Sequence, residues 1–484
     1  MATHVTPIRS TSSVPPAISL LRGAQSHRYG VDRLLNSYQA IPNGSTVRLA
    51  KRTSNLFRAR GASDSPGLDV SGLGGVISLD ATARTADVQG MCTYESLVAA
   101  TLPHGLMPLV VPQLKTITLG GAVTGLGIES TSFRNGLPHE SVLELDVLTG
   151  DGEIVTARTT GENADLFAGF PNSYGSLGYA TRLRIELEPV RPAVALRHVR
   201  FTGLDELTAA VEEICASRRW DGQAVDFLDG VVFSADEAYL TLGAWSDDDT
   251  AASDYTGDEI FYRSIRSRST DTLTTHDYLW RWDTDWFWCS KAFGAQDPRL
   301  RRWWPARYRR SDVYHRLVGL DGRYGVVARV DRWRGRPARE RVIQDVELPV
   351  ATTAEFLRWY LANVPMTPVW LCPLRLREGG PRGVPGDGGQ PWSLYPLRAG
   401  TTYVNVGFWG TVPIPAGGAD GDLNRAIEAR VAELGGHKSL YSDAYYGEEE
   451  FWAAYGGERY RALKRRYDGD GRYLDLYAKA VGRR

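Results

Sequence analysis

The stretch richest in glycine, residues 114–136, reads LKTITLGGAVTGLGIESTSFRNG and carries five glycines in 23 positions with almost no charge. Glycine permits close approach of the main chain to another molecule, at a cost of roughly 0.5–1 kcal/mol relative to alanine inside regular structure. Bare backbone N–H groups in such a loop can bind the pyrophosphate oxygens of a nucleotide cofactor. The stretch therefore predicts a cofactor loop, or else a tight packing loop without a ligand.

Two common phosphate-binding patterns do not fit this stretch. In GxGxxG, counted from Gly125 and Gly127, the third glycine would fall on Ser130. The pattern GxxxxGK[ST] needs a lysine that follows neither Gly125 nor Gly127. The spacing thus gives no support for a Rossmann-type NAD site or a Walker loop.

Size and composition limit the class of protein. A length of 484 residues predicts two or three domains, and 43% hydrophobic with 23% charged residues is typical of a soluble globular protein. A net charge of −1 provides no overall basic surface for nucleic acid. No window reaches the ~18 apolar residues of a membrane span, and residues 1–22 lack the apolar run of a signal peptide. We expect a cytoplasmic protein with a short flexible leader over residues 1–22.

The cysteine pattern also favours a cytoplasmic location. They are far apart and form no CxxC motif or Cys/His ligand pair: Cys92, Cys215, Cys289 and Cys372. This spacing predicts reduced thiols and no metal site.

The first part of the sequence predicts short strands and helices around the glycine-rich stretch. Residues 75–91 fit two strands, residues 93–105 fit a helix ended by Gly105, and residues 141–157 fit a β-hairpin that turns at TGDG. Pro189 and Pro192 then indicate a domain boundary near residue 190.

The following part predicts an α+β domain with an antiparallel sheet. Strand-then-helix patterns occupy residues 197–222 and 341–364, and further strands fit residues 225–245 and 401–410. Residues 379–392, GGPRGVPGDGGQPW, predict a mobile loop.

Residues 278–310 combine ten aromatic side chains with several arginines. Three interpretations compete for this segment. It is a buried or snorkelling helical cap, an apolar gate or membrane-surface patch for a lipid-like substrate, or a stacking surface for nucleic acid. The near-neutral charge of the whole protein argues against the third.

Residues 112–157 and 161–189 resemble the flavin-binding half of the vanillyl-alcohol-oxidase (PCMH-type) flavoproteins, and among them the Delta24-sterol reductase group. FWCSKAFGAQDPRLRRWW, VIQDVELPV, PVWLCPL and LYSDAYYGEEEFWAAYGGERYRALKRRYD are similar to that group as well. The resemblance implies an α+β fold in which two subdomains, within residues 23–190, clasp FAD. A substrate domain (191–430) would cover the isoalloxazine ring, and residues 431–484 would return to the flavin.

The resemblance also implies which residues contact FAD. In the early loop, Ser54 and Asn55 would donate hydrogen bonds and Lys51 or Arg52 would offset phosphate charge. The implied contacts of the early loop are Lys51, Arg52, Thr53, Ser54, Asn55, Leu56 and Phe57. Those of the main flavin loop are Pro112, Thr118, Leu119, Gly120, Gly121, Ala122, Gly125, Gly127, Ile128, Glu129, Ser130 and Ser132. Those at the adenine or ribose side are Gly178, Tyr179 and Ala180. Glu129 would orient the loop or lie near the substrate.

The sequence departs from the family in two respects. Many relatives attach FAD through a histidine of the early loop, which this sequence lacks, so we expect non-covalent FAD. We expect His104 and His139 to be exposed loop histidines. The N-terminal membrane segment of eukaryotic sterol reductases is also missing from the sequence.

Hydride transfer needs a nearby proton donor or acceptor. The resemblance brings the C-terminal segment to the flavin, where we expect Tyr441, Asp443 and Tyr445 within one or two turns. A tyrosine made more acidic by its neighbours, or an Asp–Tyr pair, would protonate the substrate carbon, and Lys438 would stabilise reduced flavin. The alternative is that these tyrosines only pack a domain junction. Further substrate-pocket candidates are Asp345, Glu347, Trp370 and Cys372.

Three functions follow as hypotheses. The first is an FAD-dependent oxidoreductase that reduces a C=C bond of an apolar, terpenoid- or sterol-like substrate, with NADPH as a possible electron donor. The second is an alcohol or sugar oxidase or dehydrogenase of the same fold. The third is a non-catalytic lipid-binding or nucleic-acid-binding protein.

Overall fold

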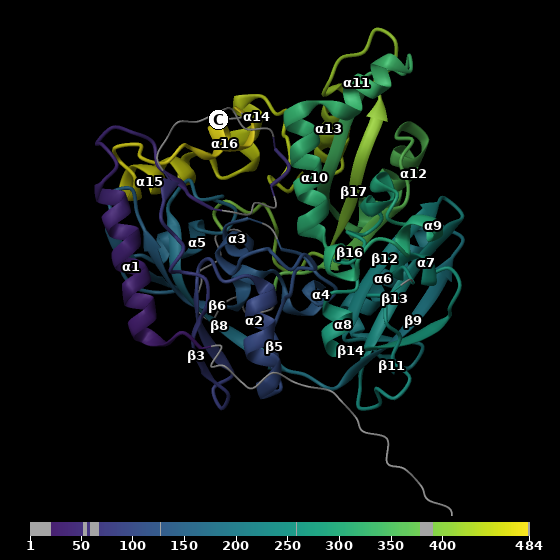
Figure 1. Ribbon diagram of the computed structural model, residues 1–484, viewed down its shortest axis with the longest axis horizontal. Helices are drawn as coiled ribbons and strands as arrows, with labels where there is room; N and C mark the ends of the chain where they lie inside the picture. The colour runs from purple at the N-terminus through teal and green to yellow at the C-terminus, as the bar shows by residue number, and fades with distance from the viewer. Residues whose placement is uncertain are drawn as a thin grey trace, which may run out of the picture.

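The computed structural model of the protein describes residues 21–51, 56–58, 67–125, 127–257, 259–377 and 391–482. The two large β-sheets of the described residues are both antiparallel and lie side by side with helices around them (Figure 1). The α+β class expected from the sequence is confirmed. The expected leader lies almost entirely outside the described residues, and so does nearly all of the loop 379–392.

The first sheet belongs to the N-terminal part of the protein. Its order is β3 (Val76–Asp80), β4 (Thr85–Gln89), β8 (Tyr179–Pro189), β6 (Val142–Leu148) and β7 (Ile154–Arg158), with β5 (Leu106–Pro108) paired to β8. The associated helices are α1 (Gly23–Gln39), α2 (Tyr94–Thr101), α3 (Leu119–Thr124), α4 (Ser132–Asn135) and α5 (Ala164–Gly169), with 3₁₀ turns η1 (Leu102–His104) and η2 (Pro138–Ser141). A separate parallel pair joins β1 (Arg48–Leu49) to β2 (Gly67–Leu68).

Several local predictions for this sheet are confirmed. β6 and β7 form the expected hairpin, and β3 and β4 form the expected strand pair. Gly105 follows α2 and η1 with a φ of 68°, a left-handed conformation that glycine adopts without a Cβ penalty.

The second sheet begins immediately after the first ends, because β8 stops at Pro189 and β9 starts at Ala193. Its order is β14 (Thr270–Thr274), β9 (Ala193–Phe201), β13 (Glu237–Ser246), β12 (Phe227–Ser234), β16 (Val369–Leu374), β17 (Tyr403–Pro413), β15 (Arg339–Pro349) and β18 (His437–Lys438). A small hairpin joins β10 (Arg219–Trp220) to β11 (Gln223–Ala224). The expected strands and the helices after β9 and β15 are confirmed.

The helices of this part differ in position. Three pack on the sheet: α6 (Leu204–Ser217), α12 (Val350–Asn363) and α13 (Asp422–Glu433). The others connect strands: α7 (Phe261–Ser264), α8 (Thr275–Leu279), η3 (Cys289–Phe293), α9 (Pro298–Arg301), η4 (Ala306–Tyr308), α10 (Ser311–Tyr324) and α11 (Val326–Trp333).

Side chains of the second sheet alternate between two faces, as the two-residue period of a strand requires. On β17, Val404, Val406 and Phe408 join the core beneath α6, α12 and α13. Asn405 and Trp409 point to the opposite face, where they line a cavity. One face therefore supplies packing, and the other supplies a site.

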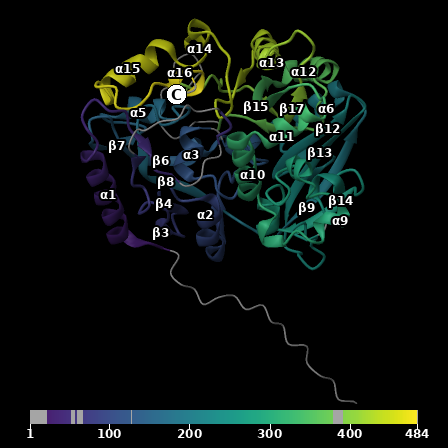
Figure 2. The same cartoon turned by 45° about the horizontal axis from the view of Figure 1, so that its top comes forward.

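The C-terminal segment connects both halves. β18 pairs with β15 of the second sheet, and α14 (Glu448–Ala454), α15 (Gly457–Tyr467) and α16 (Leu476–Ala480) then cover the first half (Figures 1 and 2). The Tyr473 hydroxyl donates a hydrogen bond to the Thr149 carbonyl over 3.0 Å, and Gly150 N donates to the Tyr467 carbonyl over 2.8 Å. Within the described residues, no helix combines the length and the apolar character needed to cross a bilayer.

Candidate active site

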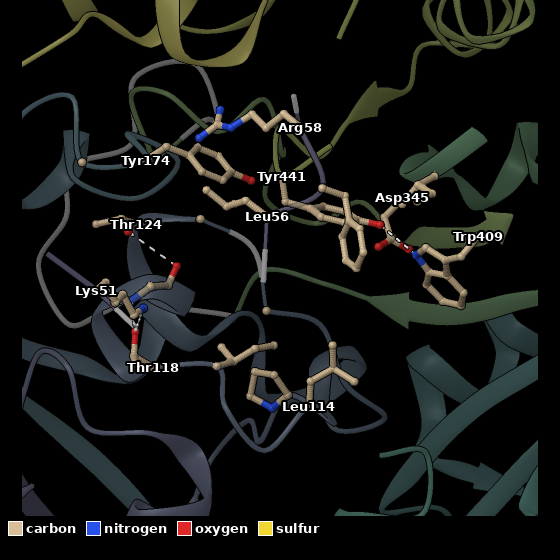
Figure 3. A pocket seen from close by; sticks show the side chains of 18 of the residues that line it. Lys51, Leu56, Arg58, Leu114, Thr118, Thr124, Tyr174, Asp345, Trp409 and Tyr441 are labelled. Atoms are coloured by element: carbon tan, nitrogen blue, oxygen red, sulfur yellow. Dashed lines mark hydrogen bonds between the residues drawn. The ribbon is translucent and has the colours of Figure 1, made fainter. Parts of the chain in front are cut away.

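A cavity of about 900 Å³ lies between the two halves of the molecule. Lys51, Thr118 and Thr124 occupy one side of it, and Asp345 and Trp409 occupy the other (Figure 3). We call these the glycine end and the aromatic end. The lining residues come from both sheets and from the C-terminal segment, so the cavity exists only in the folded protein.

The glycine end is built on α3. Thr118 is the N-cap of this helix: its Oγ1 accepts a hydrogen bond from Gly121 N and another from Lys51 Nζ at 3.0 Å. A Cβ atom at Gly121 would lie 2.9 Å from that Oγ1 and 4.0 Å from Lys51 Nζ. The missing side chain of Gly121 therefore keeps the Lys51–Thr118 pair accessible from the cavity.

The neighbouring Gly120 has a different role. A Cβ atom there would lie 2.6 Å from the carbonyl oxygen of Gly90, which accepts the hydrogen bond of Gly120 N at 2.9 Å. Gly120 therefore permits α3 to pack against β4 and its following turn. Both glycines line the cavity, but Gly120 is also required for close packing.

The first turn of α3 does not present bare N–H groups, contrary to the expectation of a backbone phosphate cradle. Leu119 N donates to the Cys92 carbonyl, Gly120 N to the Gly90 carbonyl and Gly121 N to Thr118 Oγ1. Charge for a phosphate is supplied at this end by the Lys51 ammonium instead.

The cavity fits FAD by the chemistry of its walls. The glycine end offers the Lys51 ammonium and glycines without side chains, and Nε2 of the lining residue Gln113 is buried with no hydrogen-bond partner among the described residues. A buried amide donor that is left unsatisfied costs about 1–3 kcal/mol, so a ligand acceptor at this place would be stabilising. The carbonyl and ring-nitrogen acceptors of a flavin are such groups. Lys51, Thr118, Gly121 and Gln113 are the residues that would hold the cofactor.

The aromatic end contains a buried hydrogen-bonded network around Tyr441. Trp409 Nε1 donates to the Tyr441 hydroxyl over 2.8 Å, and this hydroxyl also hydrogen-bonds the Asp345 carboxyl group. Asn405 Nδ2 donates to Asp345 Oδ1 over 3.0 Å, while Asn405 Oδ1 has no partner in the part of the chain that the structure describes. Figure 3 shows Tyr441 extending toward Asp345 and Trp409.

Burial decides the acidity of this network. It raises the pKa of Asp345 to about 6, against the hydrogen bonds from Asn405 and Tyr441, which lower it. Burial and the nearby Asp345 charge raise the pKa of Tyr441 well above its usual value. The expectation that neighbouring groups make Tyr441 more acidic is therefore wrong. Asp345 is the more acidic member of the pair.

Aromatic rings close this end of the cavity. Phe287 packs on Trp409 at 4.5 Å and on Trp370 at 5.3 Å between ring centroids, and Trp286 stacks on Phe57 at 5.6 Å. All five line the cavity. Part of the segment 278–310 is thus an apolar wall, and it consists mainly of turns and short 3₁₀ helix rather than a helical cap.

The predicted FAD contacts fall into three groups. Those that line the cavity are Lys51, Leu56, Phe57, Pro112, Thr118, Gly120, Gly121, Gly125, Gly127, Ile128, Tyr179 and Ala180. Those that do not line it are Leu119, Ala122, Glu129, Ser130, Ser132 and Gly178. Arg52, Thr53, Ser54 and Asn55 lie outside the described residues.

Glu129 lies in a buried ionic cluster instead of beside a substrate. Arg281 donates to Glu129 over 2.9 Å and to Asp229 over 2.8 Å, and Trp370 Nε1 also donates to Asp229 over 3.3 Å. Ser130 forms a hydrogen bond with Tyr278 at 2.8 Å. This cluster joins the main loop to the second sheet, and it holds the indole of Trp370 at the cavity wall.

The four residues predicted to be catalytic do not lie together at the cavity. Tyr441 lines the cavity, but residues 438–447 contain no helix, so its neighbours point elsewhere. Asp443 pairs with Arg341 at 3.2 Å, and Tyr445 lies against the Arg425 guanidinium. Lys438 is buried in an ion pair with Glu428 at 2.7 Å.

Among the substrate-pocket candidates, Asp345 and Trp370 line the cavity, while Glu347 and Cys372 do not. Ser439 donates to Glu347 over 2.6 Å, and burial raises the pKa of Glu347 well above its usual value. His139 is buried against Trp392 at 4.4 Å between ring centroids, so its expected exposure is wrong; His104 is exposed as expected.

Several lining residues were missed from the sequence: Gln113, Thr124, Tyr174, Trp286, Phe287, Asn405 and Trp409. A signal existed for Asn405 and Trp409, because TTYVNVGFWG alternates apolar residues with Asn405, Gly407 and Trp409 on the other face. Nothing local marks Gln113 or Phe287 as cavity residues.

Comparison with known proteins identifies the class of this protein as an FAD-dependent oxidoreductase. The family described as "FAD binding domain" matches residues 40–158, which include the glycine end. This match and the relatives below support the classification of the chain with the PCMH-type FAD-binding flavoproteins of the vanillyl-alcohol-oxidase superfamily.

Among its relatives, the protein is similar to two groups of named proteins. It is 24% identical to Delta(24)-sterol reductase of Arabidopsis thaliana over 446 residues, which covers 85% of this chain and 76% of that protein. It is 24% identical to Delta(24)-sterol reductase of Homo sapiens over 421 residues, or 84% and 75% of the two proteins. It is 36% identical to Cytokinin dehydrogenase 6 of Oryza sativa subsp. japonica over 151 residues, or 31% and 28%.

Proposed function

We propose that the protein reduces a C=C bond of an apolar terpenoid- or sterol-like substrate, with non-covalent FAD as hydride carrier and NADPH as electron donor, in the cytoplasm. The observation that carries this proposal is one continuous cavity with a cofactor-compatible glycine end and a buried hydroxyl–carboxyl pair at its aromatic end. Bound FAD, once reduced, supplies a hydride to a substrate carbon.

The substrate class follows from the aromatic end. Its walls carry Trp286, Phe287, Trp370, Trp409 and Ile343, which favour an apolar skeleton through buried area. The Tyr441 hydroxyl and the Asp345 and Asn405 side chains already hydrogen-bond within the protein, whereas a sugar would need a hydrogen-bond partner for each hydroxyl. The sterol reductase relatives support the same class.

The protein's own residues handle the proton. Reduction of a C=C bond adds a hydride to one carbon and a proton to the other, so a proton donor must reach the second carbon. In the proposal, the Tyr441 hydroxyl donates that proton, Trp409 Nε1–H stabilises the resulting oxygen charge, and Asp345 returns a proton to Tyr441. Asn405 orients Asp345.

A second function uses the same pair in the opposite direction. Asp345 has a pKa of about 6, so above that pH its carboxylate can accept the proton of an alcohol through Tyr441. The protein would then be an alcohol oxidase or dehydrogenase, and the cytokinin dehydrogenase relative supports oxidation by this type of domain.

One experiment separates these functions. The purified yellow protein is mixed anaerobically with NADPH, and flavin absorbance is followed; a reductase bleaches, and a sterol whose aliphatic tail contains a C=C bond then restores the oxidised spectrum with formation of the saturated product. Bleaching by an alcohol and rapid reoxidation by air would instead establish the oxidase. A protein that retains no flavin would refute both.

A further inference from the structure

The segment 298–339 differs in charge from the rest of the protein. It contains thirteen arginines and three aspartates, without lysine or glutamate, so its formal charge is +10 in a protein whose total is −1. Part of this charge is paired internally: Arg301 pairs with Asp285 at 2.6 Å, and Arg310 pairs with Glu95 at 2.8 Å and with Asp312 at 3.0 Å. Arg309 donates to main-chain carbonyl groups. Much of the remaining charge therefore faces solvent.

The exposed arginines of this segment have few acidic neighbours. Arg316 pairs with Asp312 at 2.7 Å, and Arg336 pairs with Asp331 at 3.2 Å. Seven further exposed arginines have no carboxylate partner among the described residues, although Arg339 donates to Thr411: Arg299, Arg302, Arg307, Arg329, Arg332, Arg334 and Arg339. Their charge is available to an external anionic surface.

Large apolar side chains are exposed beside these arginines. Trp333 at the end of α11 is 85% exposed, and Trp303, which follows α9, is 75% exposed. Leu300, Tyr308, Leu320 and Val330 are also exposed. Val330 and Trp333 are three residues apart on one face of α11, while Arg329 and Arg332 flank them. Arginine-flanked tryptophan on a short amphipathic helix is typical of peptides that lie in a membrane interface.

The same segment adjoins the cavity. Val318 of α10 lines the cavity, whereas Leu320, two residues later, is 52% exposed. From the other side, Trp304 packs on Tyr314 of α10 at 6.0 Å, and Tyr314 stacks on the cavity residue Phe293 at 5.7 Å. Only the thickness of α10 and its neighbours separates the exposed residues from the aromatic end.

We propose that residues 298–339 form a docking surface for an anionic lipid bilayer, with Trp303 and Trp333 inserted among the headgroups and the unpaired arginines on the lipid phosphates. An anionic bilayer matches both features, because it offers diffuse negative charge and an apolar boundary layer over a wide area. A role of the docking surface in delivering substrate to the cavity rests on the proposed function. The binding of the docking surface to a bilayer does not.

Vesicle co-sedimentation of the FAD-loaded protein tests the surface directly. With phosphatidylglycerol-containing vesicles we expect binding that weakens as salt is raised, and little binding to pure phosphatidylcholine. The double variant Trp303→Ser/Trp333→Ser and the charge variant Arg332→Glu/Arg334→Glu should each lower the partition coefficient about tenfold or more. Tyr29→Ser is a matched control, because Tyr29 is a similarly exposed aromatic residue on α1 across the molecule (Figure 1).

The outcomes distinguish this surface from the proposed reaction. Absent or salt-independent vesicle binding would overturn the docking surface while leaving flavin content and NADPH bleaching intact. A concentration-dependent dimer that Trp333→Ser dissociates would also overturn it, because the face would then join two copies. If the variants lose turnover only with substrate in vesicles, and keep it with substrate carried by cyclodextrin, the delivery role is supported. Equal turnover on vesicle-borne substrate would overturn the delivery role.

Discussion

The two ends of the cavity are built in opposite ways. The glycine end includes residues from one short run, Thr118 to Gly127, around the six-residue helix α3. The aromatic end joins side chains from β15, β16, β17, the turn after Trp286 and the C-terminal segment. The first depends on what the main chain leaves open, and the second depends on how distant strands align.

The two ends also differ in polarity, and therefore in the kind of molecule that each can bind. A cation and an amide donor at the glycine end suit a charged cofactor that is held but not consumed. The single buried acid pair at the aromatic end suits a substrate that must gain one proton. Variants that affect one end without the other test whether this division is real.

The largest effect is expected at Tyr441. Tyr441→Phe removes the proposed proton donor but keeps the ring packing against Phe57, so substrate reduction should fall about 100-fold or more while flavin content and NADPH bleaching stay normal. Stopped-flow reoxidation of the reduced flavin by substrate measures this step. Tyr445→Phe is the control, because Tyr445 does not line the cavity. Equal losses in both variants would contradict a role specific to Tyr441.

The next effect concerns the glycine end. Gly121→Val places a branched side chain against Thr118 and Lys51, and overpacking of about 1–3 kcal/mol should weaken FAD binding about 10- to 100-fold. Flavin absorbance after gel filtration measures the loss, and apoprotein unfolding should be nearly unchanged. Gly120→Val should instead lower the stability of the apoprotein markedly, because its Cβ atom would meet the Gly90 carbonyl. Full FAD occupancy in Gly121→Val would place the cofactor elsewhere.

A third effect is a pH dependence set by Asp345. Its protonated form is the one that returns a proton to Tyr441, so reduction should fall up to about tenfold per pH unit as pH rises above about 6. In Asp345→Asn this limb of the pH profile should disappear, together with most of the activity. A wild-type profile that stays flat from pH 5 to 8 would exclude Asp345 as the proton source.

The same residue has a consequence for stability. Because burial raises the pKa of Asp345 above its usual 3.8 to about 6, the folded state binds a proton more tightly than the unfolded state. Stability therefore decreases as pH rises from about 4 to 6, by at most about 3 kcal/mol. Asp345→Asn should unfold at a higher temperature than wild type at pH 7.5, and this gain should vanish near pH 4.

The smallest effect is expected at Trp409. Trp409→Phe keeps an aromatic ring beside Phe287 but deletes the Nε1–H donor to Tyr441, so reduction should slow about fivefold. Trp245→Phe, on β13 and outside the cavity lining, is the matched control. An unchanged rate in Trp409→Phe would show that Tyr441 needs no stabilising donor.

Local chemistry explains what could be predicted from the sequence. The β6–β7 hairpin and the end of α2 at Gly105 depend on contacts between near neighbours, which turn residues and side-chain periodicity reveal. Lys51 and Gly121 were found through a resemblance, because no general phosphate pattern fits them. The positions of Lys438 and Glu129 could not be predicted. A charged residue in an apolar run gives the same sequence pattern whether it forms a buried ion pair or faces a ligand.

The sequence by itself determined that α3 would carry glycines without side chains, and that β17 would carry polar and aromatic residues on one face. Only the tertiary structure decided that Gly120 packs closely against Gly90, while Gly121 lies beside the Lys51–Thr118 pair. It also decided that Asp345, Trp409 and Tyr441 meet, although they are separated by 32 to 96 residues in the sequence. The reason is physical: strand register brings Asp345 opposite Gly407, and an extended C-terminal segment then places one hydroxyl between a carboxyl group and an indole.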